Sequence, residues 1–534
     1  MNNAIQNYLN TPFRTDVTVK NSPKQVQGDD AGFVFETSDV QRLTRFLVLG
    51  TDGGTYYAGE QSLTKSNVDF IIDMILRDEQ TVRETLVDVS VNARAPKNST
   101  ALFVLALVFV HGANKREAEE ALLSVARTGT HLFEFVSYLK ALGGLGRAKR
   151  RALALWMTER RPEAMASQSV KYRQRNGYTF RDVMRLCHPV GLDVAVGDFI
   201  LNGTVTDDSP AIIRGFAKAQ NVTTGKEAVK VLKEFPNLPW EAFPTDVHRA
   251  PEFWEALFYN GMGQTALLRN VTRFAKLGLF DDLKFAGDVA KALSDPEAIR
   301  KGRMHPVQYL NALFIYKEGK KSSNPWGGYY AAPSGPDWNV NAKIAGALEK
   351  GFYASFGNVE AANKRTMVSL DVSGSMTWEA PAGLVGLDAM QASAAMAMVT
   401  VRTEPYVEVN AFSSGMQELD ITDSDSLDDV IYKMTRVRMG ATNIAAPIRK
   451  ALDERQVIDT FIVYTDNATN QGEHPYKVLE EYRRKVNSDA RLIVVGMTST
   501  GFTVADPDDK KSLDVVGFDA AAPKVMADFS AGRL

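Results

Sequence analysis

The first three-fifths of the chain is patterned as a succession of amphipathic helices. Between about residues 37 and 320, apolar residues recur three to four positions apart in short segments, and loops carrying Gly, Pro or Asn separate these segments. No stretch of this region alternates apolar and polar residues as a strand does. The expected helices are 66–77, 101–110, 116–126, 132–142, 147–160, 179–187, 211–219, 226–235, 254–260, 266–277 and 306–317. This pattern favours an all-α array of antiparallel helix pairs, as in helical-repeat proteins.

After Arg365 the pattern changes to an alternation of apolar strands and amphipathic helices. The expected strands are 366–371, 406–412, 460–466, 491–497 and 513–518, and the expected helices are 386–402, 426–435, 444–454, 475–487 and 521–530. Such alternation is typical of a doubly wound α/β domain. The stretch 321–358 is rich in Ser, Asn, Pro, Gly and aromatic residues and contains one expected helix, 339–352. We therefore predict two domains, 1–358 and 359–534.

Composition narrows the class of protein without identifying it. The 534 residues are 45% hydrophobic and 24% charged, as in ordinary globular proteins, and the net charge of −2 requires any nucleic-acid site to be a local patch. The single cysteine, Cys187, excludes an intramolecular disulfide and suits a reducing cytosol. Residues 1–3 begin no signal-peptide pattern, and the apolar run 101–110 is too short to cross a bilayer. We expect a cytoplasmic protein without a membrane partner.

A cluster of oxygen donors follows the first expected strand of the α/β region. Asp371 ends that strand, and Ser373 and Ser375 follow at alternating positions. Three oxygens at this spacing can turn toward one point, and the carboxyl edge of such a sheet is where these folds bind ligands. Hard oxygen ligands suit a small divalent metal, with Mg²⁺ the best fit.

Two further residues extend this cluster. Thr442 precedes the expected helix 444–454, and Asp466 ends the expected strand 460–466. Together the five residues resemble, in order and context, the metal-ion-dependent adhesion site of von Willebrand factor A domains; they are Asp371, Ser373, Ser375, Thr442 and Asp466. A chance match in a loop and a domain whose site stays empty are the alternatives.

A basic segment stands out in the helical region. Lys171, Arg173 and Arg175 alternate with Tyr172 and other polar residues around an expected turn, which Tyr178 closes. Cations on a rigid face can bind phosphates, and neighbouring aromatic rings can stack on unpaired bases. Most charge runs are solvated surfaces, however, and charge alone favours that interpretation.

The helix after this turn continues the basic surface. Thr179 and Asp182 are spaced to cap it. Arg181, Arg185 and His188 follow at intervals of four and three residues, so we expect them on one exposed stripe. A lone histidine such as His188 is more often structural than functional.

Several phrases along the whole chain resemble the Ro autoantigen family, in which a TROVE module precedes a von Willebrand A domain. These are Arg45-Phe46-Leu47, Gly53-Gly54-Thr55-Tyr56-Tyr57, Arg94-Ala95-Pro96-Lys97, the stretch 171–177, the stretch 266–270 and His305-Pro306. The resemblance implies a HEAT-like helical-repeat ring with a positive central hole, followed by the α/β domain, and suggests a bacterial or phage member. The loop 440–443 departs from the animal proteins, which have a second Gly and an Asp there, but it keeps Thr442.

The resemblance also implies a function, that of an RNA-binding ribonucleoprotein scaffold. Family members bind Y RNAs, which are small noncoding RNAs, on the outer surface of the ring. They bind single-stranded 3′ ends of misfolded RNA in the hole, for RNA quality control. Bacterial members use a Y-like RNA to tether an exoribonuclease. By position, Lys171 and His188 match the Y-RNA contacts, and Arg175, Arg181 and Arg185 lie in the matching stretch. Arg42, Arg45 and Arg94 are expected at the hole.

A second hypothesis makes the protein a metal-dependent interaction module, in which the A domain captures an acidic residue of a partner protein and RNA binding is incidental. Catalysis has no positive signature, because no Ser/His/Asp triad, zinc-ligand spacing or paired-carboxylate pattern stands out. We therefore expect no enzymatic activity. A ring built within one chain needs no second copy, so we expect a monomer.

Overall fold

The computed structural model describes residues 17, 19–28, 32–50, 60–319, 336–357, 359–377, 388–467 and 469–533, which form two compact units. The first unit contains the residues up to Phe70, Arg94–Pro96 and the chain from Phe356 onward, and the second contains Ile71–Ala93 and Lys97–Ser355. No helix among the described residues is long and apolar enough to span a membrane. The chain passes from the second unit back to the first at Ser355–Phe356, close to the division predicted at 358. The sequence pattern gives no sign that the first 70 residues pack with the carboxyl-terminal part.

The first unit is built on a six-stranded sheet with the order β5-β4-β3-β6-β7-β9. The strands are β3 (Thr366–Asp371), β4 (Val407–Phe412), β5 (Met416–Glu418), β6 (Thr460–Thr465), β7 (Arg491–Gly496) and β9 (Ser512–Val516). All pair in parallel except the edge strand β5, which is antiparallel to β4. Every residue of β3 and β6 is buried, which explains their continuous apolar runs. The five expected strands are confirmed, and β5 is an addition.

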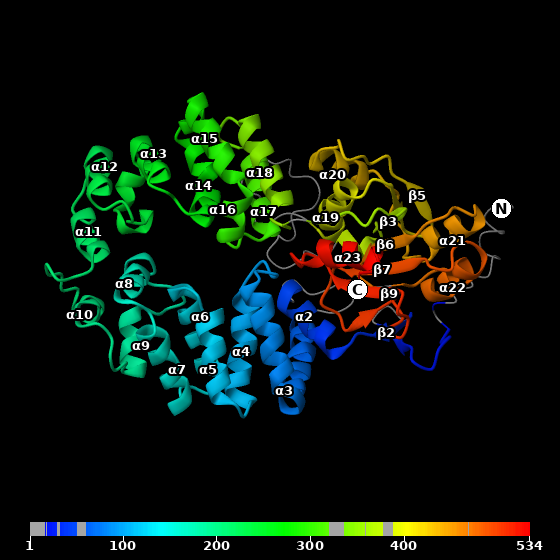
Figure 1. Cartoon of the computed structure of the whole chain (residues 1–534), viewed down its shortest axis with the longest axis horizontal. Helices are drawn as coiled ribbons and strands as arrows, with labels where there is room; N and C mark the ends of the chain where they lie inside the picture. Colours follow the sequence, from blue (N-terminus) through cyan, green and yellow to red (C-terminus); the bar gives the residue numbers. More distant parts are fainter. Residues whose placement is uncertain are drawn as a thin grey trace, which may run out of the picture. The chain divides into compact units, whose positions relative to one another are not determined.

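Helices cover both faces of this sheet, as the doubly wound prediction requires (Figure 1). They are α19 (Ala389–Thr403), α20 (Leu427–Thr435), α21 (Ala446–Asp453), α22 (Pro475–Lys485) and α23 (Ala522–Ser530). Helices α21 and α22 bury one core with Met367 and Phe461. On the opposite face, Val399 of α19, Met526 of α23 and Ile462 line one small cavity. The connections from β3 and β6 run in opposite directions along the sheet, so the carboxyl ends of these two strands flank the crevice where such folds bind ligands.

An amino-terminal segment completes this unit. Strands β1 (Val26–Gln27) and β2 (Phe33–Glu36) form an antiparallel sheet with β8 (Phe502–Thr503), and α2 (Asp39–Leu49) packs on β9. Helix α2 begins at Ser38, whose side chain forms a capping box with Gln41. In Figure 1 the blue β2 accordingly lies beside the red end of the chain.

The second unit is all α-helical. Its helices are α4 (Ser99–His111), α5 (Lys115–Val125), α6 (Gly129–Ala141), α7 (Arg147–Thr158), α8 (Pro162–Lys171), α9 (Phe180–Cys187), α10 (Val194–Asn202), α11 (Ala211–Ala219), α12 (Gly225–Glu234), α13 (Pro251–Tyr259), α14 (Gln264–Lys276), α15 (Leu283–Leu293), α16 (Pro296–Lys301), α17 (Pro306–Glu318) and α18 (Ala342–Ala354), with short 3₁₀ turns at Trp240–Ala242, Thr245–Arg249 and Leu279–Asp281. Neighbouring helices pack in succession, for example α4 on α6, α12 on α13 and α17 on α18.

The helix-pair array predicted for this region is confirmed, with differences at particular elements. The helix expected to start at Ser66 begins at Glu60 and, after a break in helical geometry at Asp78, continues to Val91; this is α3. Helices α8, α10, α15 and α16 were not expected. Helices α8 and α10 are only weakly amphipathic and α16 has six residues, whereas α15 is an amphipathic helix of 11 residues that the pattern should have predicted. Closure of the helices into a ring stays a prediction.

Candidate metal centre and candidate RNA surface

Asp371 lies at the carboxyl end of β3, next to β6. It is fully buried; its Oδ1 accepts a hydrogen bond from the backbone N–H of Ser373 (2.9 Å) and its Oδ2 accepts one from Thr465 Oγ1 (2.7 Å). Burial raises the pKa of Asp371, and the nearby charge of Asp466 raises it further, against the opposing effect of these hydrogen bonds. A carboxylate in these surroundings favours a proton or a cation beside it.

The two serines of the motif lie in the turn that follows β3. Ser373 and Ser375 are both buried, and their hydroxyl oxygens lie 3.1 Å apart. A short 3₁₀ segment, Gly374–Thr377, holds this turn. The structure therefore brings Asp371 and both hydroxyls together, as their spacing predicts.

Asp466 and Thr442 lie on two loops that hydrogen bonds join. Asp466 directly follows β6 and is buried, and its backbone oxygen accepts a hydrogen bond from Thr498 Oγ1 (3.1 Å). Thr442 is buried as well; its N–H donates to Asn470 Oδ1 (3.0 Å) and its carbonyl oxygen accepts from the N–H of Asn470 (3.1 Å). Asn470 thus fixes the loop that carries Thr442 against the loop that carries Asp466.

This donor set fits a hard divalent cation. Burial, and then the repulsion from the charge of Asp466, raises the pKa of Asp371, so a proton or a bound cation is favoured beside these two buried carboxylates. Mg²⁺ takes one or two carboxylates together with neutral oxygens and water. Where the structure describes the chain, no three His, Cys, Asp or Glu residues gather to hold a metal, so hydroxyls would complete this ligand set. A bound ion would supply a Lewis-acidic position at the sheet edge.

The basic segment after α8 forms a tight turn. Arg175 and Tyr178 exchange backbone hydrogen bonds of 3.0 and 2.9 Å, and the two residues between them, Asn176 and Gly177, have φ values of +52° and +76°. Asn-Gly is the preferred pair for a turn that needs positive φ at both central positions. The turn is therefore specified locally, and it presents its side chains from a defined backbone.

The cations of this segment are available to solvent and lie near aromatic rings. Arg173 and Arg175 are exposed, and Lys171 is half-buried at the end of α8. The Lys171 ammonium lies 5.5 Å from the ring centre of Tyr172, and the Arg173 guanidinium lies 5.2 Å from that of Phe216, beside a groove of about 610 Å³. Tyr172 is half-buried and Phe216 is buried, so this segment offers an RNA its cations more than these two rings.

Helix α9 has the two faces that the sequence predicts. Thr179 caps it, and Asp182 completes the capping box. The buried face consists of Phe180, Val183 and Cys187. The exposed residues are Arg181, Arg185 and His188, the last of which ends the helix in the left-handed conformation.

The expected position of Arg45 at the central hole is wrong. We expected it to line an RNA passage, but it is fully buried within the first unit, where its guanidinium pairs with Asp514. A charge enclosed in this way and paired with a carboxylate has no surface to offer to RNA. Arg45 is therefore a structural residue of the α/β unit.

Arg42 and Arg94 are also engaged in the first unit but keep some exposure. The Arg42 guanidinium donates to Ser66 and Asn67. Arg94 makes a two-pronged ion pair with Asp519 and is only 24% exposed. An RNA role for these two residues stays a prediction.

Comparison with known proteins identifies the family. Residues 26–227 and 222–325 match the TROVE domain, and residues 365–530 match the Ro60 vWA domain. A Deinococcus radiodurans protein, RNA-binding protein RO60, is 39% identical over 535 residues, which cover 98% of both chains. The chain belongs to the Ro60 family.

Other relatives agree with this assignment. The RNA-binding protein RO60 of Caenorhabditis elegans is 28% identical over 596 residues, which cover 96% of this chain and 90% of the worm protein. The crystal structure of the D. radiodurans Ro protein matches this Ro60-family chain with a TM-score of 0.67, covering 93% of this chain and 100% of that one. The predicted family and two-part fold are thereby confirmed.

Sequence reasoning missed several residues that shape the candidate metal centre of this Ro60-family protein. Thr465 orients Asp371, Asn470 fixes Thr442, and Thr498 holds the backbone of Asp466. Thr465 could have been found, because it is the last residue of the strand before Asp466. Asn470 and Thr498 have no comparable signal, since only the fold brings their loops to the site.

Proposed function

We propose that this protein binds a structured small RNA of the Y type on the surface formed by residues 171–178 and α9. The observation that carries the proposal is the excess of positive charge on this surface. Residues 171–188 contain five Lys and Arg residues and one acidic residue, Asp182, whose carboxylate is used in the helix cap. Within the described parts of the chain, none of these five cations has a carboxylate at ion-pair distance.

A surface on which cations outnumber carboxylates attracts phosphates more strongly than one on which both signs alternate. Ordinary charged surfaces intersperse both signs. Burial raises the pKa of Glu241, and the nearby charges of Lys171 and Arg175 lower it, so this carboxyl is the acidic neighbour of two of the five cations without forming an ion pair with them. When these side chains neutralise RNA phosphates, the counterions condensed around those phosphates would be released. The names of the relatives, RNA-binding protein RO60, support RNA as the ligand class.

The proposal extends to the family's wider role. We place the protein in RNA quality control, as a cytoplasmic, monomeric and non-enzymatic scaffold that also receives single-stranded 3′ ends of misfolded RNA in a central hole. A Y-like RNA would tether it to an exoribonuclease. Support for this part is the family membership alone.

Charge reversal tests the RNA surface. The double variant K171E/R181E should weaken binding of a structured Y-like RNA, and the slope of log K against log salt should fall by about 0.9 for each duplex phosphate that the protein no longer neutralises. The matched control is K284E/K291E, which reverses two exposed lysines of α15 in the same unit. Gel-shift titrations at several salt concentrations measure both quantities. Equal affinity and slope for the K171E/R181E variant and the wild type would contradict the proposal.

A second activity is proposed for the α/β unit. We propose that Asp371, Ser373, Ser375, Thr442 and Asp466 hold Mg²⁺ and that the ion captures an acidic side chain of a partner protein. The supporting observation is the buried carboxylate pair with converging hydroxyls at the carboxyl edge of the sheet. With at most two negative charges among its ligands, the ion would remain able to accept an incoming carboxylate.

A further inference from the structure

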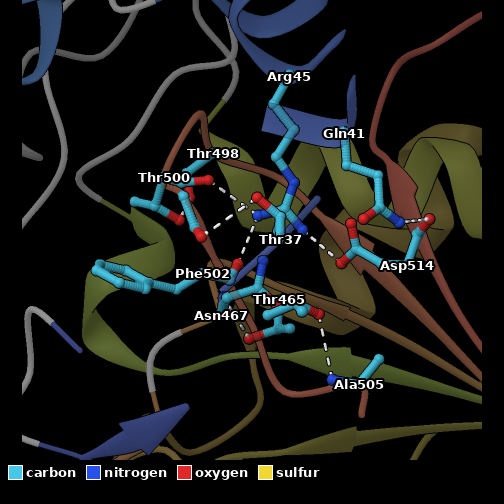
Figure 2. Close-up of polar contacts among 12 residues, drawn as sticks. Thr37, Gln41, Arg45, Thr465, Asn467, Thr498, Thr500, Phe502, Ala505 and Asp514 are labelled. Carbon is cyan, nitrogen blue, oxygen red and sulfur yellow. Dashed lines mark hydrogen bonds and ion pairs between the residues drawn. The ribbon is translucent and has the colours of Figure 1, made fainter. Parts of the chain in front are cut away.

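Arg45 extends from α2 into a polar cluster of the α/β unit (Figure 2). It donates to the carbonyl oxygens of Thr500 (3.0 Å) and Phe502 and pairs with the carboxylate of Asp514 on β9. Gln41, one turn earlier on α2, donates to the backbone oxygen of Asp514. One side chain from the amino-terminal segment thus connects three acceptors on two elements of the carboxyl-terminal domain.

Two of the three acceptors of Arg45, Thr500 and Phe502, belong to the segment that supports Asp466. Thr500, whose carbonyl accepts from Arg45, lies two residues after Thr498, and the two hydroxyls are 3.5 Å apart. Thr498 Oγ1 in turn donates to the backbone oxygen of Asp466. A continuous series of contacts therefore joins the Arg45 guanidinium to a residue of the candidate metal centre.

A second contact joins Arg45 to the same centre from the side of β7. Gly496 ends β7, and a Cβ there would lie 3.0 Å from Arg45 Nη2 and 2.8 Å from Asn467 Nδ2. Both side chains therefore pack against this glycine. The backbone N–H of Asn467 donates to Thr465 Oγ1 (3.2 Å), and this hydroxyl is the group that orients Asp371. Because Gly496 has no side chain, Arg45 can lie close to Asn467 in the loop that follows Asp466.

We propose that Arg45 is a positioning residue for the metal centre, so that the amino-terminal segment β2–α2 is part of the machinery that holds Asp466 and Asp371 in place. This inference rests on the metal site proposed above. Arg45 touches no metal ligand itself and acts through Thr498, Asn467 and the backbone of loop 498–502. The centre consequently depends on a residue that matches the TROVE domain, although its five ligands all lie within residues 365–530, which match the vWA domain.

The chemistry of arginine suits this position. A planar guanidinium carries five N–H donors in a fixed fork, so it can serve two carbonyls and a carboxylate at once. A lysine would keep the charge opposite Asp514 but could not match that geometry. Burial raises the pKa of Asp514 and the Arg45 charge lowers it, so removing Arg45 alone leaves a buried carboxylate without its counter-charge. A variant that removes both charges is therefore needed beside the single one.

The test compares four full-length variants with the wild type, using Mn²⁺ as a spectroscopic substitute for Mg²⁺. Variants R45K, R45M/D514L and T498V each disturb the series of contacts. R94M is the control, because Arg94 also pairs with a buried aspartate of this unit, Asp519, and takes no part in the series of contacts described above. Mn²⁺ affinity is measured by electron paramagnetic resonance, and folding by circular dichroism and thermal melting.

We expect R45M/D514L to weaken Mn²⁺ binding about 10-fold or more, which is the effect usual for groups that support metal ligands. R45K and T498V should weaken it less, and R94M should lower the melting temperature without changing Mn²⁺ affinity. Wild-type affinity in folded R45M/D514L and T498V would overturn the positioning role while leaving the metal site intact. Equal weakening in R94M would overturn it too, because general destabilisation would then be the cause. Absence of Mn²⁺ binding by the wild type would instead overturn the metal site and, with it, this inference.

Discussion

Thr465 and Thr460 provide a matched pair of substitutions on one strand. Both are buried threonines of β6. Thr465 Oγ1 donates to Asp371 Oδ2 (2.7 Å) and accepts from the N–H of Asn467 (3.2 Å). Thr460 Oγ1 has no hydrogen-bond partner among the described residues. Replacing each by valine preserves the shape and the β-branched character and removes only the hydroxyl.

The two variants should differ clearly in stability. T465V loses a hydrogen bond to a carboxyl group and leaves the Asn467 N–H buried without its acceptor. Each effect costs about 1–3 kcal/mol, and because neighbouring effects are not additive we expect a total of about 2–4 kcal/mol. T460V has no hydrogen bond to lose, so its free energy of unfolding should stay within about 0.5 kcal/mol of the wild type.

The same pair also tests the metal centre. Because Thr465 orients Asp371, T465V should weaken Mg²⁺ binding by about 10- to 100-fold, whereas T460V should leave it unchanged. Urea unfolding in EDTA, followed by circular dichroism, measures the first difference, and titration calorimetry with Mg²⁺ measures the second. Equal stability losses in the two variants, or unchanged Mg²⁺ affinity in folded T465V, would refute the assigned role of Thr465.

Two further predictions concern Asp371. The variant D371A should abolish Mg²⁺ binding and leave the affinity for Y-like RNA unchanged, because the RNA surface lies in the other unit. Calorimetry measures Mg²⁺ binding and a gel shift measures RNA binding. Loss of RNA binding by a folded variant would mean that the two activities are coupled. The pKa of Asp371 is raised in the folded state, so between its unfolded value near 3.8 and its folded value the native state holds a proton that the unfolded state has released. The metal-free wild type should therefore lose stability relative to D371N as pH rises through that range, and Mg²⁺ should stabilise the wild type more at the higher pH. Melting temperatures of both proteins at pH 5 and pH 8 measure this, and identical pH dependence would contradict it.

Local pattern was sufficient for the two kinds of architecture and for part of the site. The buried strands that end at Asp371 and just before Asp466 appear as mainly apolar runs, because strands covered by helices on both faces bury few polar residues. The capped helix α9 and the Asn-Gly turn before it are likewise specified by residues a few positions apart. The alternation of strand and helix then places both aspartates at one edge of the sheet.

Other features of the site depend on tertiary structure alone. Arg45 and Asp514 are 469 residues apart, and nothing near either residue in the sequence marks it as half of a buried ion pair. The family resemblance led us to expect Arg45 at the central hole, whereas the packing of α2 on β9 encloses this side chain. The assignment of the first 70 residues to the α/β unit follows from the same contacts. Periodicity and capping act over a few residues and therefore determine the elements, whereas burial of a charge depends on which distant element covers it, and only the folded chain decides that.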